Sequence, residues 1–286
     1  MSVVTTRALV LAGGGLVGIA WELGVLLGLR AAGIGTRGWD RIVGTSAGSV
    51  VGAAAGTEGG LDALRQAPWV DSATELNEYL ATLDPVAIAA IEALWFARPE
   101  GPDIAIRAAI GQRAINAGNE HEARFIRTVA GLLPLDSWPA PLVTTAVDAE
   151  TGAFLTFDAG SGVSLVAAVA ASCSIPGVFP PVTINGRRYI DGGVRSGTCA
   201  DLADGYDLVV LVALTQPGGP WSARQAAEVA GLRAGGSRVV EITPGPEPLA
   251  PSEHALLEPS LLPDVVESGM AIGAASAALV RDAEAA

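Results

Sequence analysis

The stretch Arg41-Ile42-Val43-Gly44-Thr45-Ser46-Ala47-Gly48-Ser49 is the part of the chain on which the fold depends most. A short apolar run leads into Gly-x-Ser-x-Gly, and a segment rich in Ala, Gly and Val continues to Gly56. Strand, tight turn and helix in this order form a nucleophile elbow, in which one serine hydroxyl is lifted out of the fold. Gly44 and Gly48 fit this turn because a Cβ at either position would crowd the turn or the neighbouring strand. Ser46 is therefore the candidate nucleophile, at a helix N-terminus that favours developing negative charge.

Composition narrows the class of protein. The 286 residues are enough for one large domain or two small ones. Half of them are hydrophobic and only 16% are charged, which is typical of a well-packed globular protein. The net charge of −13 argues against nucleic acid as a partner and against electrostatic attachment to an anionic membrane. Every basic residue is an arginine, which excludes Schiff-base and Ser–Lys mechanisms.

The cysteines and the apolar N-terminal run bear on the compartment. Cys173 and Cys199 make no disulfide scaffold and have no metal-ligand spacing around them, so we expect two small buried thiols and no metal site. The run from Ala8 to Leu29 could be a membrane span or a signal peptide. Its early glycines, Glu22 near its middle and only Arg7 ahead of it weaken both interpretations. We expect a soluble, cytoplasmic protein.

The same run is better explained as a buried strand over residues 8–12, a glycine turn and a helix over residues 19–32. The turn is Gly13-Gly14-Gly15-Leu16-Val17-Gly18, which could also bind a dinucleotide. That alternative expects an acidic residue about twenty positions on, at the end of a second strand. Asp40 is near that distance but precedes Ile42-Val43, so the nucleotide interpretation is the weaker one.

Residues 57–140 are predicted to form a helical insertion over the sheet, because prolines punctuate a series of helical segments and no clear strand occurs. The predicted helices cover residues 61–66, 73–81, 86–96, 104–115 and 121–133. The cluster Leu94-Trp95-Phe96 could face lipid, but ordinary core packing is the favoured interpretation.

The second half of the chain returns to strands. A hairpin is predicted from residues 142–147 and 153–157, and Asn185-Gly186 signals a second one between 182–184 and 188–190. The other predicted elements are a helix over 164–172, strands over 208–214 and 238–242, and a closing helix over 264–282. Long apolar strands separated by helices predict an α/β protein with a mostly parallel central sheet flanked by helices.

A serine nucleophile needs a base, and the chain has only two histidines. His121 lies at a polar helix start and is expected on the surface. Ser46, Asp191 and His254 follow the Ser…Asp…His order of α/β-hydrolases. An elbow after a single strand is early for that fold, however, and His254 lies in a Pro-rich, charged stretch. The histidine triad stays open as an alternative.

Asp191 is the best candidate base without histidine. It ends a predicted strand and precedes Gly192 and Gly193, which let the backbone approach another element closely. An ordinary Asp, with a pKa of about 3.9, is a weak base at neutral pH, so partial burial would have to raise it. The turn beginning at Gly13 offers backbone N–H groups without side chains, which suits an oxyanion hole.

Together these pieces resemble one family, the patatin-like phospholipases, which are serine acyl hydrolases with a Ser–Asp dyad. The resemblance spans roughly residues 7–215 and is carried by four motifs: Gly13 to Gly18, Gly44 to Gly48, Ala171-Ser172-x-x-x-Pro176-x-x-Phe179-x-Pro181, and Asp191 to Gly193. It implies a single domain over residues 1–286 with a three-layer α/β arrangement and a C-terminal helical tail over residues 264–286.

The resemblance also implies the chemistry. Ser46 would be the nucleophile, Asp191 the base, the amides of Gly13, Gly14 and Gly15 the oxyanion hole, and the segment with Pro176, Phe179 and Pro181 the wall of the substrate site. The implied activity is hydrolysis of carboxylic esters of lipids, of the phospholipase A type, without cofactor or metal. The implied partner is a lipid or other acyl ester, with transient peripheral membrane contact left open.

Two departures from the family pattern bear on substrate and efficiency. Val17 stands where the glycine loop usually carries Arg or Lys, and Val194-Arg195-Ser196-Gly197-Thr198 lacks the Asn and Pro that often follow Asp-Gly-Gly. A second class of function therefore stays open, namely a catalytically degenerate relative that binds an acyl ligand or a nucleotide.

Overall fold

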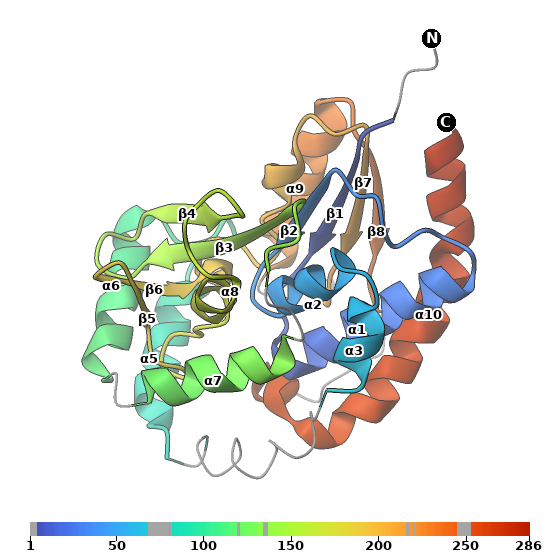
Figure 1. Ribbon diagram of the computed structural model, residues 1–286. Coiled ribbons are helices and arrows are strands. Elements are labelled where there is room, and N and C mark those ends of the chain that lie inside the picture. Colours follow the sequence, from blue (N-terminus) through green and yellow to red (C-terminus); the bar gives the residue numbers. More distant parts are fainter. Residues whose placement is uncertain are drawn as a thin grey trace.

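A computed structural model describes residues 5–67, 80, 82–118, 121–133, 137–215, 218–219, 221–244 and 253–286. Its centre is an eight-stranded sheet with the order β5-β6-β3-β2-β1-β7-β8, to which β4 adds beside β3 (Figure 1). The strands are β1 (Arg7–Leu11), β2 (Arg41–Gly44), β3 (Leu142–Asp148), β4 (Phe154–Phe157), β5 (Val182–Ile184), β6 (Arg187–Asp191), β7 (Leu208–Val212) and β8 (Arg238–Ile242).

The sheet has a parallel part and an antiparallel edge. β1 lies between β2 and β7, and the five neighbouring strands β3, β2, β1, β7 and β8 all run parallel. Leu9 of β1 pairs with Ile42 on one side and with Val210 on the other. β4 and β6 each pair antiparallel with β3, and β5 pairs antiparallel with β6. The prediction of a mostly parallel sheet is confirmed, as are both predicted hairpins.

Helices cover both faces of the sheet. The helices are α1 (Gly15–Ala31), α2 (Ala47–Ala55), α3 (Gly60–Arg65), α5 (Pro85–Trp95), α6 (Ile104–Asn116), α7 (Glu122–Leu132), α8 (Leu165–Ser172), α9 (Ser222–Ala234) and α10 (Leu262–Ala285). Short 3₁₀ turns are η1 (Gly192–Val194), η2 (Ala200–Ala203), η3 (Glu253–Leu257) and η4 (Pro259–Leu261). Side chains alternate along β1, so Leu9 packs with α1 and α2 whereas Val10 packs with α9 and η2. The result is a three-layer α/β arrangement (Figure 1).

The helical insertion after α2 is confirmed where the structure describes it, by α3, α5, α6 and α7. The helix predicted over residues 73–81 falls almost wholly outside the described residues. Trp95 is buried, and its ring stacks on that of Phe96 with centroids 5.3 Å apart. Core packing is therefore the correct interpretation for the buried ring of Trp95.

Two helix predictions need correction. α1 begins at Gly15 and not at residue 19, because the glycine turn is tight enough for the Gly18 N–H to donate to the Gly14 carbonyl at 2.7 Å. The sequence did not predict α9 at all. Its buried face mixes the apolar Val229 and Leu232 with polar side chains, which hides the helical period of apolar residues.

The C-terminal helix is an integral part of the core and not a peripheral tail. Gly24 and Gly28 of α1 lie against Gly269 and Gly273 of α10, and each pair is spaced by four residues. A Cβ on Gly28 would collide with the carbonyl oxygen of Met270 on α10. Only glycine permits backbones to approach this closely, so α10 holds α1 in place and, with it, the glycine turn that begins α1.

The described residues contain neither a helix that could span a membrane nor a cluster of metal ligands. Every helix in them is too short or too polar to cross a bilayer. No group of three or more His, Cys, Asp or Glu side chains within the described ranges is placed to hold a metal ion. Both cysteines are free thiols, with Cys199 buried and Cys173 half-buried.

Candidate active site

Ser46 lies on a strained turn between β2 and α2. Its φ of 53° and ψ of −118° are unusual for a residue with a side chain, and such strain is kept where the surrounding structure enforces it. A Cβ on Gly48 would collide with the carbonyl oxygen of Leu11, and one on Gly44 would lie 2.6 Å from the carbonyl oxygen of Gly48. These contacts confirm the reason for expecting glycine at both positions.

Asp191 meets Ser46 from the antiparallel edge of the sheet. It is the last residue of β6, opposite Ala146 of β3, and only 2% of it is exposed. The Ser46 side chain interacts with the Asp191 carboxyl, and the Gly193 N–H donates to Asp191 Oδ1 at 2.7 Å. Burial raises the pKa of Asp191 to about 7, against the lowering effect of these two contacts. The condition that burial must raise this pKa is therefore met.

The C-terminal end of α8 holds both residues in place. Ser172 Oγ accepts the Ser46 N–H at 2.9 Å, and the Ser174 carbonyl accepts the Asp191 N–H at 2.9 Å. Both serines are fully buried. Ala171-Ser172 belongs to the motifs of the family resemblance, which assigns it no role. Such a contact joins residues more than a hundred positions apart, so local pattern does not reveal it.

The glycine turn lies beside Ser46, and the structure distinguishes its three amides. A Cβ on Gly13 would be 3.5 Å from the Cβ of Ser46. The Gly13 N–H donates to the Gly197 carbonyl at 2.8 Å, so this amide already has a partner. Within the described ranges no hydrogen bond is made by the N–H of Gly14 or Gly15. Of the three amides expected to donate to an oxyanion, those of Gly14 and Gly15 are therefore the two without a partner among the described residues.

Ser46 opens into an apolar cavity. Gly15, Leu16 and Ile19 of α1, Ala47 and Val50 of α2, several residues of α7, and Leu257 of η3 line it. Phe179 forms part of its wall and stacks on Phe125 of α7, with ring centroids 4.6 Å apart. The polar side chains at this cavity, besides Ser46, are His121, Arg124, Thr128 and Cys173. The lining suits an apolar chain ending in a group that Ser46 can reach.

The structure separates the three residues predicted for the substrate wall. Phe179 lines this cavity and a second one beside α5, and Pro180 lines both as well. Pro176 and Pro181 are buried and line neither of these two cavities. Of the three, Phe179 is therefore the residue placed at the cavity surface, and a role in substrate binding stays a prediction.

Val17 and His121, two further residues noted in the sequence, have defined places. Val17 is fully buried in the core and leaves no cation in the glycine turn. His121 lines the Ser46 cavity, which the sequence did not predict. The side chain of His254 lies outside the described part of the structure, so the Ser46–Asp191–His254 alternative remains a prediction.

Cys173 also lies at the site, where the sequence placed only an inert thiol. Its Sγ donates to the Ser46 carbonyl at 3.3 Å and lies 3.7 Å from Ser49 Oγ. Burial, together with the nearby Asp191, raises the pKa of the thiol to about 12, so it stays protonated. Cys173 therefore supports the elbow as a neutral hydrogen-bond donor.

The sequence of the chain is similar to those of several known proteins. Uncharacterized NTE family proteins of Mycobacterium bovis and Mycobacterium tuberculosis are 32% identical to this chain over 189 residues, which is 65% of the chain and 42% of each relative. The match thus spans less than half the length of these relatives.

Among solved structures, VipD from Legionella pneumophila matches 94% of the chain and 66% of its own length, with 12% identity and a TM-score of 0.45. The type III effector ExoU, known in Pseudomonas aeruginosa, matches 98% of the chain and 53% of its own length, with 17% identity and a TM-score of 0.44. A family model described as patatin-like phospholipase matches residues 9–204, which include Ser46, Asp191 and the glycine turn. Because this match covers well over half of the length of the chain, the chain belongs to the patatin-like phospholipase family.

Proposed function

We propose that the chain hydrolyses carboxylic esters of lipids, with Ser46 as the nucleophile and Asp191 as its base. One observation carries this proposal: a serine on a strained elbow interacts with a buried carboxyl whose pKa burial raises to about 7, and this serine lines an apolar cavity. Family membership supports the same reaction class. A base with a pKa near the working pH combines a useful ionised fraction with useful proton affinity.

The reaction proceeds in two steps. Ser46 Oγ attacks the acyl carbonyl carbon while Asp191 takes the hydroxyl proton, and the resulting oxyanion accepts hydrogen bonds from the Gly14 and Gly15 amides. Asp191 then gives the proton to the departing alcohol oxygen, which leaves an acyl group on Ser46. In the second step Asp191 takes a proton from a water molecule, which attacks the acyl carbon. Asp191 then gives this proton to Ser46 Oγ as the bond to the acyl carbon breaks, which releases the carboxylic acid and restores the Ser46 hydroxyl and the Asp191 carboxylate.

The helix α5 presents an apolar surface beside the second cavity. α5 is apolar except for Glu92, and its Val86 is 76% exposed. Ala90 and Ile91 of α5 line the second cavity, whose wall is shared with the Ser46 cavity at Phe179 and Pro180. We propose that α5 touches the lipid surface from which substrate enters.

Charge supports this orientation. Within residues 82–118 and 121–133, five arginines balance five carboxylates, although the whole chain carries −13. The α5–α7 side therefore carries no net charge, and anionic lipid repels it less than the charge of the whole chain would suggest. It needs no net positive charge, because the exposed apolar side chains of α5 provide the attraction.

The experiment that tests the nucleophile is labelling with a fluorophosphonate probe, read as the mass of the intact protein. The probe phosphonylates only a serine activated by a base, with fluoride as the leaving group. We expect one label on the wild type and none on Ser46→Ala. Ser161→Ala is the matched control, since Ser161 is exposed and bonds only to its own turn at Asp158.

The outcomes separate the alternatives. A wild type that takes no label would favour a protein that binds an acyl ligand or nucleotide without turnover. Loss of labelling in His254→Ala, with the fold intact, would favour the histidine triad over the dyad. The dyad requires that His254→Ala label at close to the wild-type rate.

A further inference from the structure

The segment that follows Asp191 returns to the glycine turn. Ser196 Oγ accepts the N–H groups of Thr198 at 3.3 Å and Cys199 at 3.0 Å, which closes a tight turn over residues 196–199. At its tip the Gly197 carbonyl accepts the Gly13 N–H at 2.8 Å. The Gly197 carbonyl thus joins this turn by a hydrogen bond to the glycine turn that carries the proposed oxyanion donors.

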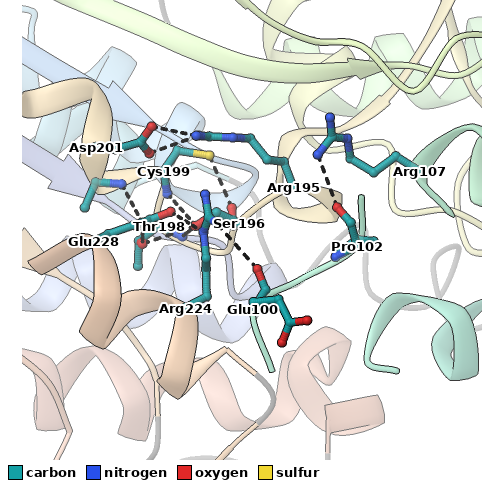
Figure 2. Close-up of polar contacts among 11 residues, drawn as sticks. Glu100, Pro102, Arg107, Arg195, Ser196, Thr198, Cys199, Asp201, Arg224 and Glu228 are labelled. Atoms are coloured by element: carbon teal, nitrogen blue, oxygen red, sulfur yellow. Dashed lines mark hydrogen bonds and ion pairs between the residues drawn. The ribbon is translucent and has the colours of Figure 1, made fainter. Parts of the chain in front are cut away.

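This turn is held by Glu228 of α9, whose side chain is 4% exposed (Figure 2). Glu228 Oε2 accepts the Thr198 hydroxyl at 2.6 Å and the Ala200 N–H at 2.9 Å. Its other oxygen accepts the Arg224 Nε–H at 2.9 Å. Thr198, Ala200 and Arg224 thus all donate to one buried carboxylate, so removing that carboxylate would leave buried donors without this partner, which is costly away from water.

Other anchors act on the same segment. The indole of Trp221, at the N-terminus of α9, lies so close to Gly197 that a Cβ there would be 3.0 Å from Trp221 Cγ. Arg195 makes a two-fold bond to Asp201, at 2.9 and 2.6 Å, visible beside Glu228 in Figure 2. Because Glu228 and Trp221 both contact the 196–199 turn, the position of the Gly197 carbonyl depends on the position of α9.

We propose that Glu228 is a positioning residue for the oxyanion donors. It fixes the 196–199 turn through Thr198, and the Gly197 carbonyl of that turn fixes Gly13 and hence the neighbouring amides of Gly14 and Gly15. α9 lies beyond residue 204, where the match of the family model ends. The inference rests on the proposed hydrolase function, in which these amides stabilise the transition state.

Thr198→Val tests the link most cleanly, because it keeps the side-chain shape and removes only the hydroxyl that Glu228 accepts. Kinetics with a p-nitrophenyl ester should show kcat reduced about 10-fold, below the roughly 10²–10³-fold cost of removing an oxyanion donor outright. KM should stay within about 2-fold, because a group acting only in the transition state leaves ground-state binding alone. Thr198→Ser, which restores the hydroxyl, should recover kcat.

The matched control is Thr57→Val, since Thr57 Oγ1 donates to the Ala53 carbonyl at the end of α2, away from the turn. It should leave kcat and KM unchanged. Glu228→Gln keeps an acceptor oxygen for Thr198 but loses the charge facing Arg224, so its kcat should lie between those of wild type and Thr198→Val. If Thr198→Val melts at a lower temperature with kcat unchanged, the role is purely structural and the proposal is overturned.

A second measurement needs no turnover. Amide hydrogen exchange should be faster at residues 13–18 in Thr198→Val than in wild type or Thr57→Val, because the Gly13 N–H loses a fixed acceptor. Unchanged exchange there overturns the proposal whatever the kinetics show. A wild type without esterase activity, together with faster exchange in Thr198→Val, would refute the hydrolase and leave the positioning role standing.

Discussion

Ser46 and Asp191 each lie in surroundings that change their chemistry. The Ser46 backbone is held in a strained conformation at the elbow, and its carbonyl accepts the Ser49 hydroxyl at 2.6 Å. Burial of Asp191 disfavours its charged form, whereas its contacts with the Ser46 side chain and the Gly193 N–H favour that form. The balance places the proton affinity of the carboxyl near neutrality, which a solvent-exposed Asp would not reach.

The pH dependence of activity follows from this balance. Asp191 acts as a base only when ionised, so kcat/KM should rise with pH, reach half its maximum near pH 7 and then level off. The measurement is the rate with a p-nitrophenyl ester from pH 5 to 9. A profile that stays flat across this range would mean that no group of this pKa controls the reaction.

Stability should change with pH in the opposite sense. The pKa of Asp191 is raised from 3.8 to about 7 on folding, so between these values the native state binds more protons than the unfolded state. The free energy of unfolding contributed by Asp191 therefore falls as pH rises through this window. Asp191→Asn should lack this contribution, which urea unfolding at pH 5 and pH 8 would reveal as a smaller difference between the two pH values.

At the residue scale, the sequence was informative wherever one backbone or one reaction demands a particular residue type. Gly44, Gly48 and Ser46 could be predicted because the elbow tolerates few alternatives, and Asp191 because the chain has few histidines and this carboxylate ends a strand before two glycines. Ser172 and Gly197 were not assigned roles. Each acts by a hydrogen bond to a distant part of the chain, and a serine or glycine in isolation carries no sign of it.

At the scale of elements, α1 and α10 pack closely against each other. Gly24 and Gly28 contact α10, and Gly269 and Gly273 contact α1, so the two backbones meet without intervening side chains. The sequence predicted both helices but not their pairing, because small residues on a helix also suit several other surroundings. α9 was missed since the polar Gln225 and Glu228 occupy its buried face.

Gly28→Ala tests the α1–α10 contact. The new methyl group would collide with the Met270 carbonyl, and overpacking of this kind costs about 1–3 kcal/mol. The thermal midpoint should therefore fall clearly. Gly231→Ala, in α9 with nothing within 4 Å of the added carbon, should instead keep or raise the midpoint, since Ala favours a helix over Gly. Equal midpoints for Gly28→Ala and wild type would contradict the close crossing.

Val86→Glu tests the role of α5 at a lipid surface. A carboxylate at this exposed position should weaken cosedimentation with phosphatidylcholine vesicles while leaving turnover of a soluble p-nitrophenyl ester unchanged. Leu279→Glu is the matched control, because Leu279 is 59% exposed on α10 and lines neither of the two cavities. If Val86→Glu binds vesicles as well as Leu279→Glu does, α5 is not the contact.

At the scale of the whole molecule, the central strands bring together parts of the chain that lie far apart in sequence. Ser46 follows β2, Gly13 follows β1 and Asp191 ends β6, so the parallel strands and the antiparallel edge meet at one end of the sheet. The fold class was predictable because each apolar strand and its following helix are local features. The contribution of the chain beyond residue 204 was not, because α9, η3 and α10 act on the site only through contacts.

The most direct test of the dyad is the release of free fatty acid from phosphatidylcholine vesicles, measured by mass spectrometry with purified wild type, Ser46→Ala, Asp191→Asn and Ser161→Ala. We expect release by wild type and Ser161→Ala, and a loss of at least about 10³-fold in both Ser46→Ala and Asp191→Asn, because members of one catalytic unit fail together. Undiminished release by Ser46→Ala or by Asp191→Asn would contradict the account.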